Sequence, residues 1–195
     1  DAELWSLIGY VHRRLGDWQE VAAAFARATQ LDPRDANLFY NLGGVTFLNT
    51  NHYAEAVRAF DQALRLAPDL YVAAVRKGIA YVRWQGQLDT LRAVLRRVPS
   101  DAELPTLGSS TGQQVQLLLW ERQADSLLRV LMTARVAVFD AQIILAPASL
   151  YAAWAHRLRG DGPAARAAFD SACVFLDSAV RARPASRPSS RPVSR

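Results

Sequence analysis

The sequence predicts an all-α fold, an α-solenoid of antiparallel helix pairs. In residues 37–68 apolar and small side chains recur at helical spacing on two stripes, separated by a polar break at residues 51–53. Gly43, Ala56 and Ala63 stand where the two helices would touch, and Pro68 ends the second helix. A pair this short cannot bury its apolar faces alone, so it needs neighbours of the same kind.

Two neighbours have the same pattern. Gly9, Gly43 and Gly78 are spaced by 34 and 35 residues, and each is followed by a turn, a second apolar stripe and a proline. The pattern W-x2-L-G-x2-Y, then A-x3-F-x2-A, then P resembles a tetratricopeptide repeat array. His12 and Thr46 stand where an aromatic residue is usual, and the second and third repeats carry one extra residue before the turn. The resemblance implies a right-handed superhelix.

These patterns divide the chain into four parts. We expect three regular hairpins in residues 1–99, with turns near 16–18, 50–53 and 85–87 and no sheet. Glycine, proline, serine and threonine make residues 100–113 a predicted loop. In residues 114–183 we expect two degenerate hairpins. Within them, residues 134–146 are expected to be either extended or helical. An Arg-Pro repeat predicts that residues 184–195 are disordered.

The apolar periodicity also predicts which faces are buried. In the first helix the expected inward residues are Leu4, Ile8 and Leu15. In the last helix they are Phe169, Cys173, Leu176 and Val180, and Phe175 lies on a second apolar face that we expect to be at least partly exposed. An uncovered face at the end of the array raises the alternative of end-to-end self-association.

Charge argues against a nucleic-acid partner for the folded part. The chain has 23 basic and 18 acidic residues, but five arginines and no acid lie after residue 180. Positions 1–180 are therefore neutral by count, whereas a nucleic-acid-binding solenoid carries its basic stripe on the fold itself.

No pattern indicates an enzyme, a cofactor or a metal site. His12, His52 and His156 lie far apart and lack metal-type spacing, so a packing role is favoured for His12 and His156. Cys173 is expected to be a buried, inert thiol. The five tryptophans mostly occupy packing positions, and no phosphate loop or nucleophile motif is present. No apolar run reaches membrane-spanning length.

The remaining candidate for a functional site is a binding surface. The resemblance implies that the first helices line a concave groove that holds an extended peptide or a partner helix. By phase the groove residues are Tyr10, Arg13, Arg14, Asn37, Tyr40, Asn41, Phe47, Arg76, Ile79 and Arg83. The alternative is that these are ordinary half-exposed residues. The family's chaperone-tail clamp would fall at Ser6, Tyr10, Asn41, Val72 and Arg76, where only Asn41 and Arg76 match, so we do not expect that ligand.

Two functions stay open. The first is a non-enzymatic module that binds a partner protein or peptide in the groove. The second is the sensory or regulatory region of a bacterial signalling enzyme, because residues 150–172 also resemble the repeat regions beside serine/threonine kinases and adenylate or guanylate cyclases. We interpret the chain as a piece of a longer one, located in the cytoplasm or as the extracytoplasmic part of a membrane-anchored signalling protein.

Overall fold

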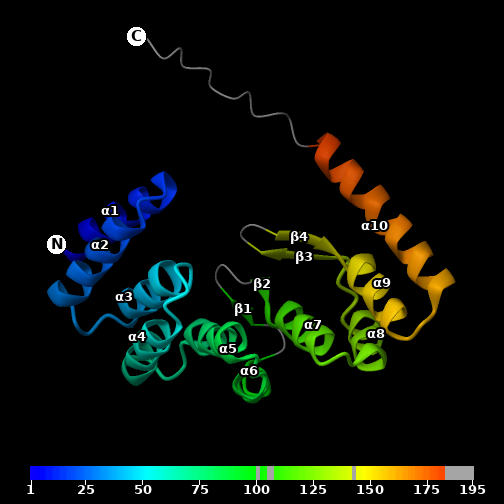
Figure 1. Cartoon of the computed structure of the whole chain (residues 1–195), viewed down its shortest axis with the longest axis horizontal. Coiled ribbons are helices and arrows are strands. Elements are labelled where there is room, and N and C mark those ends of the chain that lie inside the picture. Colours follow the sequence, from blue (N-terminus) through cyan, green and yellow to red (C-terminus); the bar gives the residue numbers. More distant parts are fainter. Residues whose placement is uncertain (100–101, 105–107, 142–143, 183–195) are drawn as a thin grey trace, which may run out of the picture. The chain divides into compact units, whose positions relative to one another are not determined.

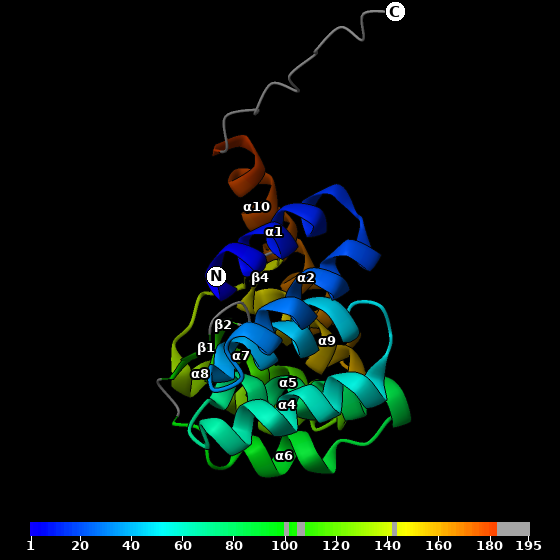
Figure 2. The same cartoon turned by 90° about the vertical axis from the view of Figure 1, so that its left-hand side faces the viewer.

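The computed structural model describes residues 1–99, 102–104, 108–141 and 144–182. The chain forms two compact units, of which the first ends at Leu117 and the second begins at Leu118. In residues 1–99, consecutive helices pack as three antiparallel pairs (Figures 1 and 2). The pairs are α1 (Ala2–Leu15) with α2 (Trp18–Leu31), α3 (Ala36–Asn41) and the π-helical segment η1 (Leu42–Phe47) with α4 (Tyr53–Leu66), and α5 (Tyr71–Gln85) with α6 (Asp89–Leu95).

The predicted turns of these pairs are confirmed, and the first two share one geometry. The backbone N–H of Asp17 donates to the His12 carbonyl at 3.0 Å, and that of His52 donates to the Phe47 carbonyl at 2.8 Å. Such a bond across five residues requires a left-handed residue just after the helix. Gly16 supplies it in the first pair, with a φ of 83°.

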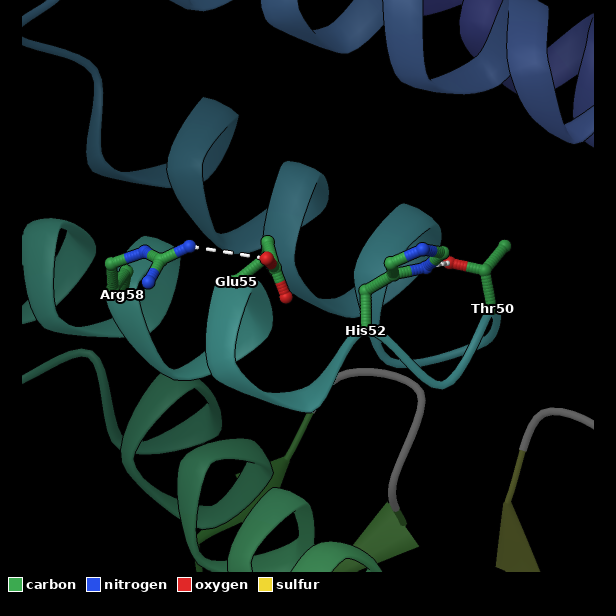
Figure 3. A network of polar contacts seen from close by, with 4 residues as sticks. All are labelled: Thr50, His52, Glu55 and Arg58. Atoms are coloured by element: carbon green, nitrogen blue, oxygen red, sulfur yellow. Dashed lines mark hydrogen bonds and ion pairs between the residues drawn. The ribbon is translucent and has the colours of Figure 1, made fainter.

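Asparagine takes the place of glycine in the second turn. Asn51 has a φ of 62°, a value that asparagine tolerates better than most residues. Its Oδ1 accepts a hydrogen bond from the Tyr53 hydroxyl at 2.8 Å. The Thr50 hydroxyl lies 2.8 Å from Nδ1 of His52, and the Glu55–Arg58 ion pair follows in α4 (Figure 3). These contacts fix where α4 begins.

In each pair a glycine of the first helix lies directly against a large buried residue of the second helix. A Cβ atom added at these glycines would lie closer than 3 Å to its neighbour: 2.8 Å from Phe25 for Gly9, 2.9 Å from Phe60 for Gly43, and 2.8 Å from Leu91 for Gly78. Any side chain there would push the helices apart. The glycines therefore set the distance between the helices of each pair.

A π-helical segment absorbs the extra residue of the second repeat. In η1 the N–H of Leu48 donates to the Gly43 carbonyl, five residues back, at 2.8 Å. An inserted residue that widens one turn in this way leaves the helix on both sides in phase. The third repeat instead extends its first helix, because α5 has 15 residues where α1 has 14.

Two short β-hairpins correct the prediction of a chain without sheet. β1 (Glu103–Leu104) pairs with β2 (Gly108–Ser109), and β3 (Val138–Ala141) pairs with β4 (Ile144–Pro147), both antiparallel. The second hairpin resolves the ambiguous segment as extended, as its β-branched and aromatic residues favour. Both hairpins lie in connections between helices, so the pairing of the helices is unchanged.

The second unit repeats the hairpin architecture. It contains the end of α7 (Ser110–Trp120), then α8 (Ala124–Ala134), α9 (Ala148–Leu158) and α10 (Gly162–Ala182). Helix α9 packs against both α8 and α10. α7 begins inside the segment predicted to be a loop, and α10 ends within a residue of its predicted end.

The turns of the later hairpins match those of the first two. The N–H groups of Gln123 and Asp161 donate to carbonyls five residues back, at 2.9 and 3.0 Å. The left-handed residues of the five turns are Gly16, Asn51, Gly86, Arg122 and Gly160, at spacings of 35, 35, 36 and 38 residues. This period supports the prediction of two degenerate repeats after the three regular ones.

The outer face of α1 contradicts part of the predicted burial. Leu4 is 56% exposed, and Leu15 is exposed as well. Leu38, which stands five residues before Gly43 as Leu4 stands before Gly9, is only 5% exposed. The difference arises because α2 packs against the second pair and covers Leu38, whereas among the described residues no preceding helix covers the outer face of α1, whose main contacts are with α2. Periodicity marks such a position as apolar, and only a neighbouring helix buries it.

The last helix shows the same effect at the other end. Cys173 and Val180 are exposed, so the prediction of an inward stripe through them is wrong, and so is that of a buried thiol. The buried residues of α10 are Ala165 and Ala172. Phe175 is half-buried, which confirms that it is at least partly exposed.

The two adjacent glycines of η1 provide a matched test of the close approach. A Cβ at Gly43 meets the Phe60 ring, whereas a Cβ at Gly44 has no neighbour nearer than 3.8 Å. We expect Gly43→Ala to lower the free energy of unfolding by about 1–3 kcal/mol through overpacking. Gly44→Ala should leave it unchanged or raise it by up to about 1 kcal/mol, because alanine is the better helix former. Urea denaturation measures both. Equal losses in the two variants would contradict the role of the contact.

Candidate functional site

The structure brings four of the predicted groove residues together at the first two pairs. The Tyr10 side chain of α1 forms a hydrogen bond with the Asn41 side chain of α3, and Tyr40 and Arg13 lie close enough to act on it electrostatically. The pKa of the Tyr10 phenol is raised, first because burial disfavours the phenolate and then by Tyr40, while Arg13 and the Asn41 bond lower it. This cluster, Tyr10, Arg13, Tyr40 and Asn41, joins the first helices of two repeats.

The core of each pair holds the rings of the cluster in place. Tyr10 packs edge-on against the buried Phe25 of α2, with ring centroids 5.3 Å apart and an interplanar angle of 81°. Tyr40 packs against the buried Phe60 of α4, with centroids 6.4 Å apart. Each ring is therefore anchored on the buried phenylalanine of its own pair and is still partly exposed at the surface.

The other predicted groove residues divide into exposed and packed ones. Arg14, Asn37 and Arg83 are exposed, and Arg76 is half-buried. Phe47 packs against the core of the second pair, and Ile79 packs against that of the third.

An aromatic pair on α5 was missed by the sequence reasoning. Tyr81 and Trp84 stack with ring centroids 6.3 Å apart at 22°, next to the exposed Arg83. Trp84 is itself exposed, as are Trp5, Trp18 and Trp120, and only Trp154 is half-buried. The prediction that the tryptophans mostly fill cores is therefore wrong. For the pair of Tyr81 and Trp84, the available signal in the sequence was the spacing of three residues, which places both rings on one side of a helix.

His12 and His156 lie in the last turns of α1 and α9, and each faces the aspartate that precedes the second helix of its hairpin. Nδ1 of His12 is 3.3 Å from Oδ2 of Asp17, and Nδ1 of His156 is 3.8 Å from Oδ2 of Asp161. Among the described residues no group of three His, Cys, Asp or Glu side chains could hold a metal ion. Within the same residues, none of the helices has the length and apolar character needed to span a membrane.

The chaperone-tail clamp has no counterpart here. Ser6 and Val72, which occupy two of its five positions, are both buried. Neither side chain could contact a peptide on the surface, in agreement with the mismatch in sequence.

Comparison with known proteins identifies the repeats. Two family models described as "Tetratricopeptide repeat" match residues 2–35 and 36–70. The boundary between them lies in the connection that joins α2 to α3. Residues 2–70 are therefore two tetratricopeptide repeats, and the fold is that of an all-α solenoid. Among curated protein sequences, none matches this chain significantly.

Solved structures share the fold over most of the chain. The type IV pilus biogenesis factor PilW is 21% identical, with a TM-score of 0.70 over 94% of this chain and 80% of PilW. MamA residues 41 to the end from Desulfovibrio magneticus RS-1 is 19% identical, with a TM-score of 0.63 over 91% of this chain and 96% of MamA. YrrB, described as a tetratricopeptide-repeat protein with an unusual peptide-binding site, is 18% identical, with a TM-score of 0.57 over 92% and 89%. At these identities the likeness concerns the fold alone.

The Tyr10–Asn41 hydrogen bond gives a test of how the first two repeats are joined. We expect Tyr10→Phe to lower the free energy of unfolding by about 0.5–1.5 kcal/mol, because it removes only the hydroxyl and keeps the ring on Phe25. Tyr71→Phe is the control, since no hydrogen bond of the Tyr71 hydroxyl is present among the described residues. Urea unfolding measures both variants, and equal effects would show that the bond does not join the repeats.

Proposed function

We propose that the chain is a non-enzymatic protein-interaction module that binds a segment of a partner protein across its first helices, α1, α3 and α5. The observation that carries the proposal is the Tyr10 cluster, where two aromatic rings, an amide and a guanidinium from two repeats meet at the surface. Aromatic residues beside arginine supply a large rigid contact area and charge-assisted hydrogen bonds, the usual basis of a binding hot spot.

Three further residues extend this surface along α5. Arg76, Ile79 and Arg83 come from the first helix of the third pair, and the Tyr81–Trp84 stack lies on the same helix. The charges favour a partner segment with acidic side chains. YrrB, which shares the fold, is described as having a peptide-binding site, and this supports a peptide as the ligand class.

Two alternatives stay as predictions. A role as the regulatory region of a signalling kinase or cyclase rests on the sequence resemblance of residues 150–172 alone. The compartment is likewise open between the cytoplasm and the extracytoplasmic side. The pilus biogenesis factor PilW shares the fold, which does not decide either point.

The groove is tested with a partner recovered by pull-down and then titrated against variants. We expect Arg13→Ala and Arg83→Ala to weaken binding by roughly 1–2 kcal/mol and to make it less sensitive to salt, because each removes a charge that salt screens. Arg27→Ala is the matched control, an exposed arginine on the second helix α2. Equal weakening by all three changes would refute a site on the first helices.

The aromatic residues of the groove require a check on folding. Tyr40→Ala and Phe47→Ala should weaken binding by roughly 1–4 kcal/mol, the range for aromatic hot spots. Because both residues pack against the core of the second pair, both variants should also lose stability. Binding is therefore compared at a temperature where circular dichroism shows each variant folded.

We also propose end-to-end self-association through the uncovered face of α1. Leu4, Leu7, Val11 and Leu15 lie on one side of this helix, and all four are exposed. Leu38 is buried at the position equivalent to Leu4 because a second helix of the preceding pair covers it. In a second copy, α10 is the second helix of a hairpin and has an exposed side. Stacking this side of α10 on α1 would continue the array.

Sedimentation velocity at increasing protein concentration tests this association. We expect oligomers of the wild-type chain, and we expect the double variant Leu7→Glu with Val11→Glu to remain monomeric and as stable as wild type. Met132→Glu, which changes an exposed apolar residue of α8, should associate as wild type does. A wild-type chain that stays monomeric at every concentration would contradict the proposal.

A further inference from the structure

A cavity in the second unit is lined by an aromatic residue and by arginine, the two side-chain types that also meet in the Tyr10 cluster. It has a volume of about 470 Å³ and is lined by Leu119 from the end of α7, by Arg122 from the following turn, and by Trp154, Arg157 and Leu158 from α9. That volume is in the range of ligand-binding pockets. All five residues belong to one compact unit.

Trp154 and Arg157 occupy the same positions in the last hairpin as Tyr10 and Arg13 occupy in the first. Trp154 follows the buried Ala153, as Tyr10 follows Gly9, and Arg157 comes three residues after Trp154, as Arg13 comes after Tyr10. The turn that closes each hairpin is also the same, with His156 and Asp161 in the places of His12 and Asp17. The last hairpin thus has an aromatic–arginine pair on its surface in the same places as the first, together with the second-helix pattern Ala165-x3-Phe169-x2-Ala172.

Three rings in contact fix the indole of Trp154. Trp154 packs edge-on against Tyr151, with centroids 5.5 Å apart at 84°. Tyr151 is buried, and it packs edge-on against Phe139 of β3 with centroids 5.2 Å apart. Burial also raises the pKa of the Tyr151 phenol. The apolar wall of the cavity is therefore formed before any ligand binds, which lowers the entropic cost of binding.

The charged groups of the cavity are the guanidinium groups of two arginines, and both are open to a ligand. Arg122 and Arg157 are exposed, and neither guanidinium has an ion pair or hydrogen bond among the described residues. The neighbouring acids have other partners: Asp125 lies 3.4 Å from Arg159, and Asp161 lies near His156. Among the described residues that line the cavity none is acidic. Two arginines beside an indole and two leucines complement a carboxylate next to a large apolar side chain.

We propose that this cavity is a second peptide-binding site, specific for a segment in which Asp or Glu side chains alternate with large apolar ones. The apolar side chain enters between Trp154, Leu119 and Leu158. The adjacent carboxylates bind Arg122 and Arg157. The site extends the proposed function to the second unit and uses none of the residues of the first.

The test titrates the full chain with a fluorescein-labelled peptide of alternating aspartate and leucine, followed by fluorescence polarisation. We expect binding that Arg122→Ala and Arg157→Ala each weaken roughly tenfold, the loss of one charge-assisted contact. Arg159→Ala is the matched control. It removes the same charge, but Arg159 stands two residues after Arg157 and is already paired with Asp125. The same peptide with asparagine in place of aspartate should bind at least tenfold more weakly.

A second measurement locates the ligand. The indole N–H resonance that Trp154→Phe removes should shift when the peptide is added, and the other four indole resonances should not. Absence of binding, equal losses for Arg159→Ala and Arg157→Ala, or equal affinity for the asparagine peptide would each overturn the proposal. Arg13→Ala should leave this binding unchanged, so the outcome is independent of the groove on the first helices.

Discussion

The fold depends on the contact between a first-helix glycine and the large residue that faces it. Gly9 faces Phe25, Gly43 faces Phe60, and the missing Cβ lets the aromatic ring fill the space between the helices. Phe25 and Phe60 are fully buried as a result. The third pair replaces phenylalanine with Leu91 and brings its backbone against Gly78. The interhelical distance is thus kept by a different residue, at the cost of leaving no room for any side chain.

The helices of successive pairs are held by contacts that the glycine pattern does not determine. Lys77 of α5 forms an ion pair with Asp61 of α4 at 2.6 Å. Lys77 stands one residue before Gly78, where the first two repeats have Ile8 and Leu42. A charged residue therefore stands at the α4–α5 junction, in a position that is apolar in the first two repeats. Partly exposed pairs of this kind contribute little to stability, up to about 1 kcal/mol, but they favour one register over others.

Sequence reasoning predicted the helices well and the burial at the ends of the array poorly. The glycine, turn and proline signals are local, so they located the three regular hairpins and the fold class, and the helical period of the apolar residues located the two degenerate ones. Whether Leu4 or Cys173 is buried depends on a neighbouring helix, which periodicity along one helix cannot report. The segment of β3 and β4 was left open between extended and helical for a related reason, since the two strands are stabilised by each other and not by a pattern in either alone.

The candidate site was predictable in its position and not in its contacts. Phase placed Tyr10, Tyr40 and Asn41 on one side of their helices, but the hydrogen bond that joins two repeats depends on how the pairs stack. In the last hairpin Ala153 replaces the first-helix glycine, while the second-helix pattern of Ala165, Phe169 and Ala172 is kept. Trp154 and Arg157 nonetheless stand in the places of Tyr10 and Arg13. Because packing constrains the inward residues and a ligand constrains the outward ones, the two sets can change separately. An outward aromatic–arginine pair that recurs in the first and last hairpins is therefore an indication of binding that the repeat motif itself does not give.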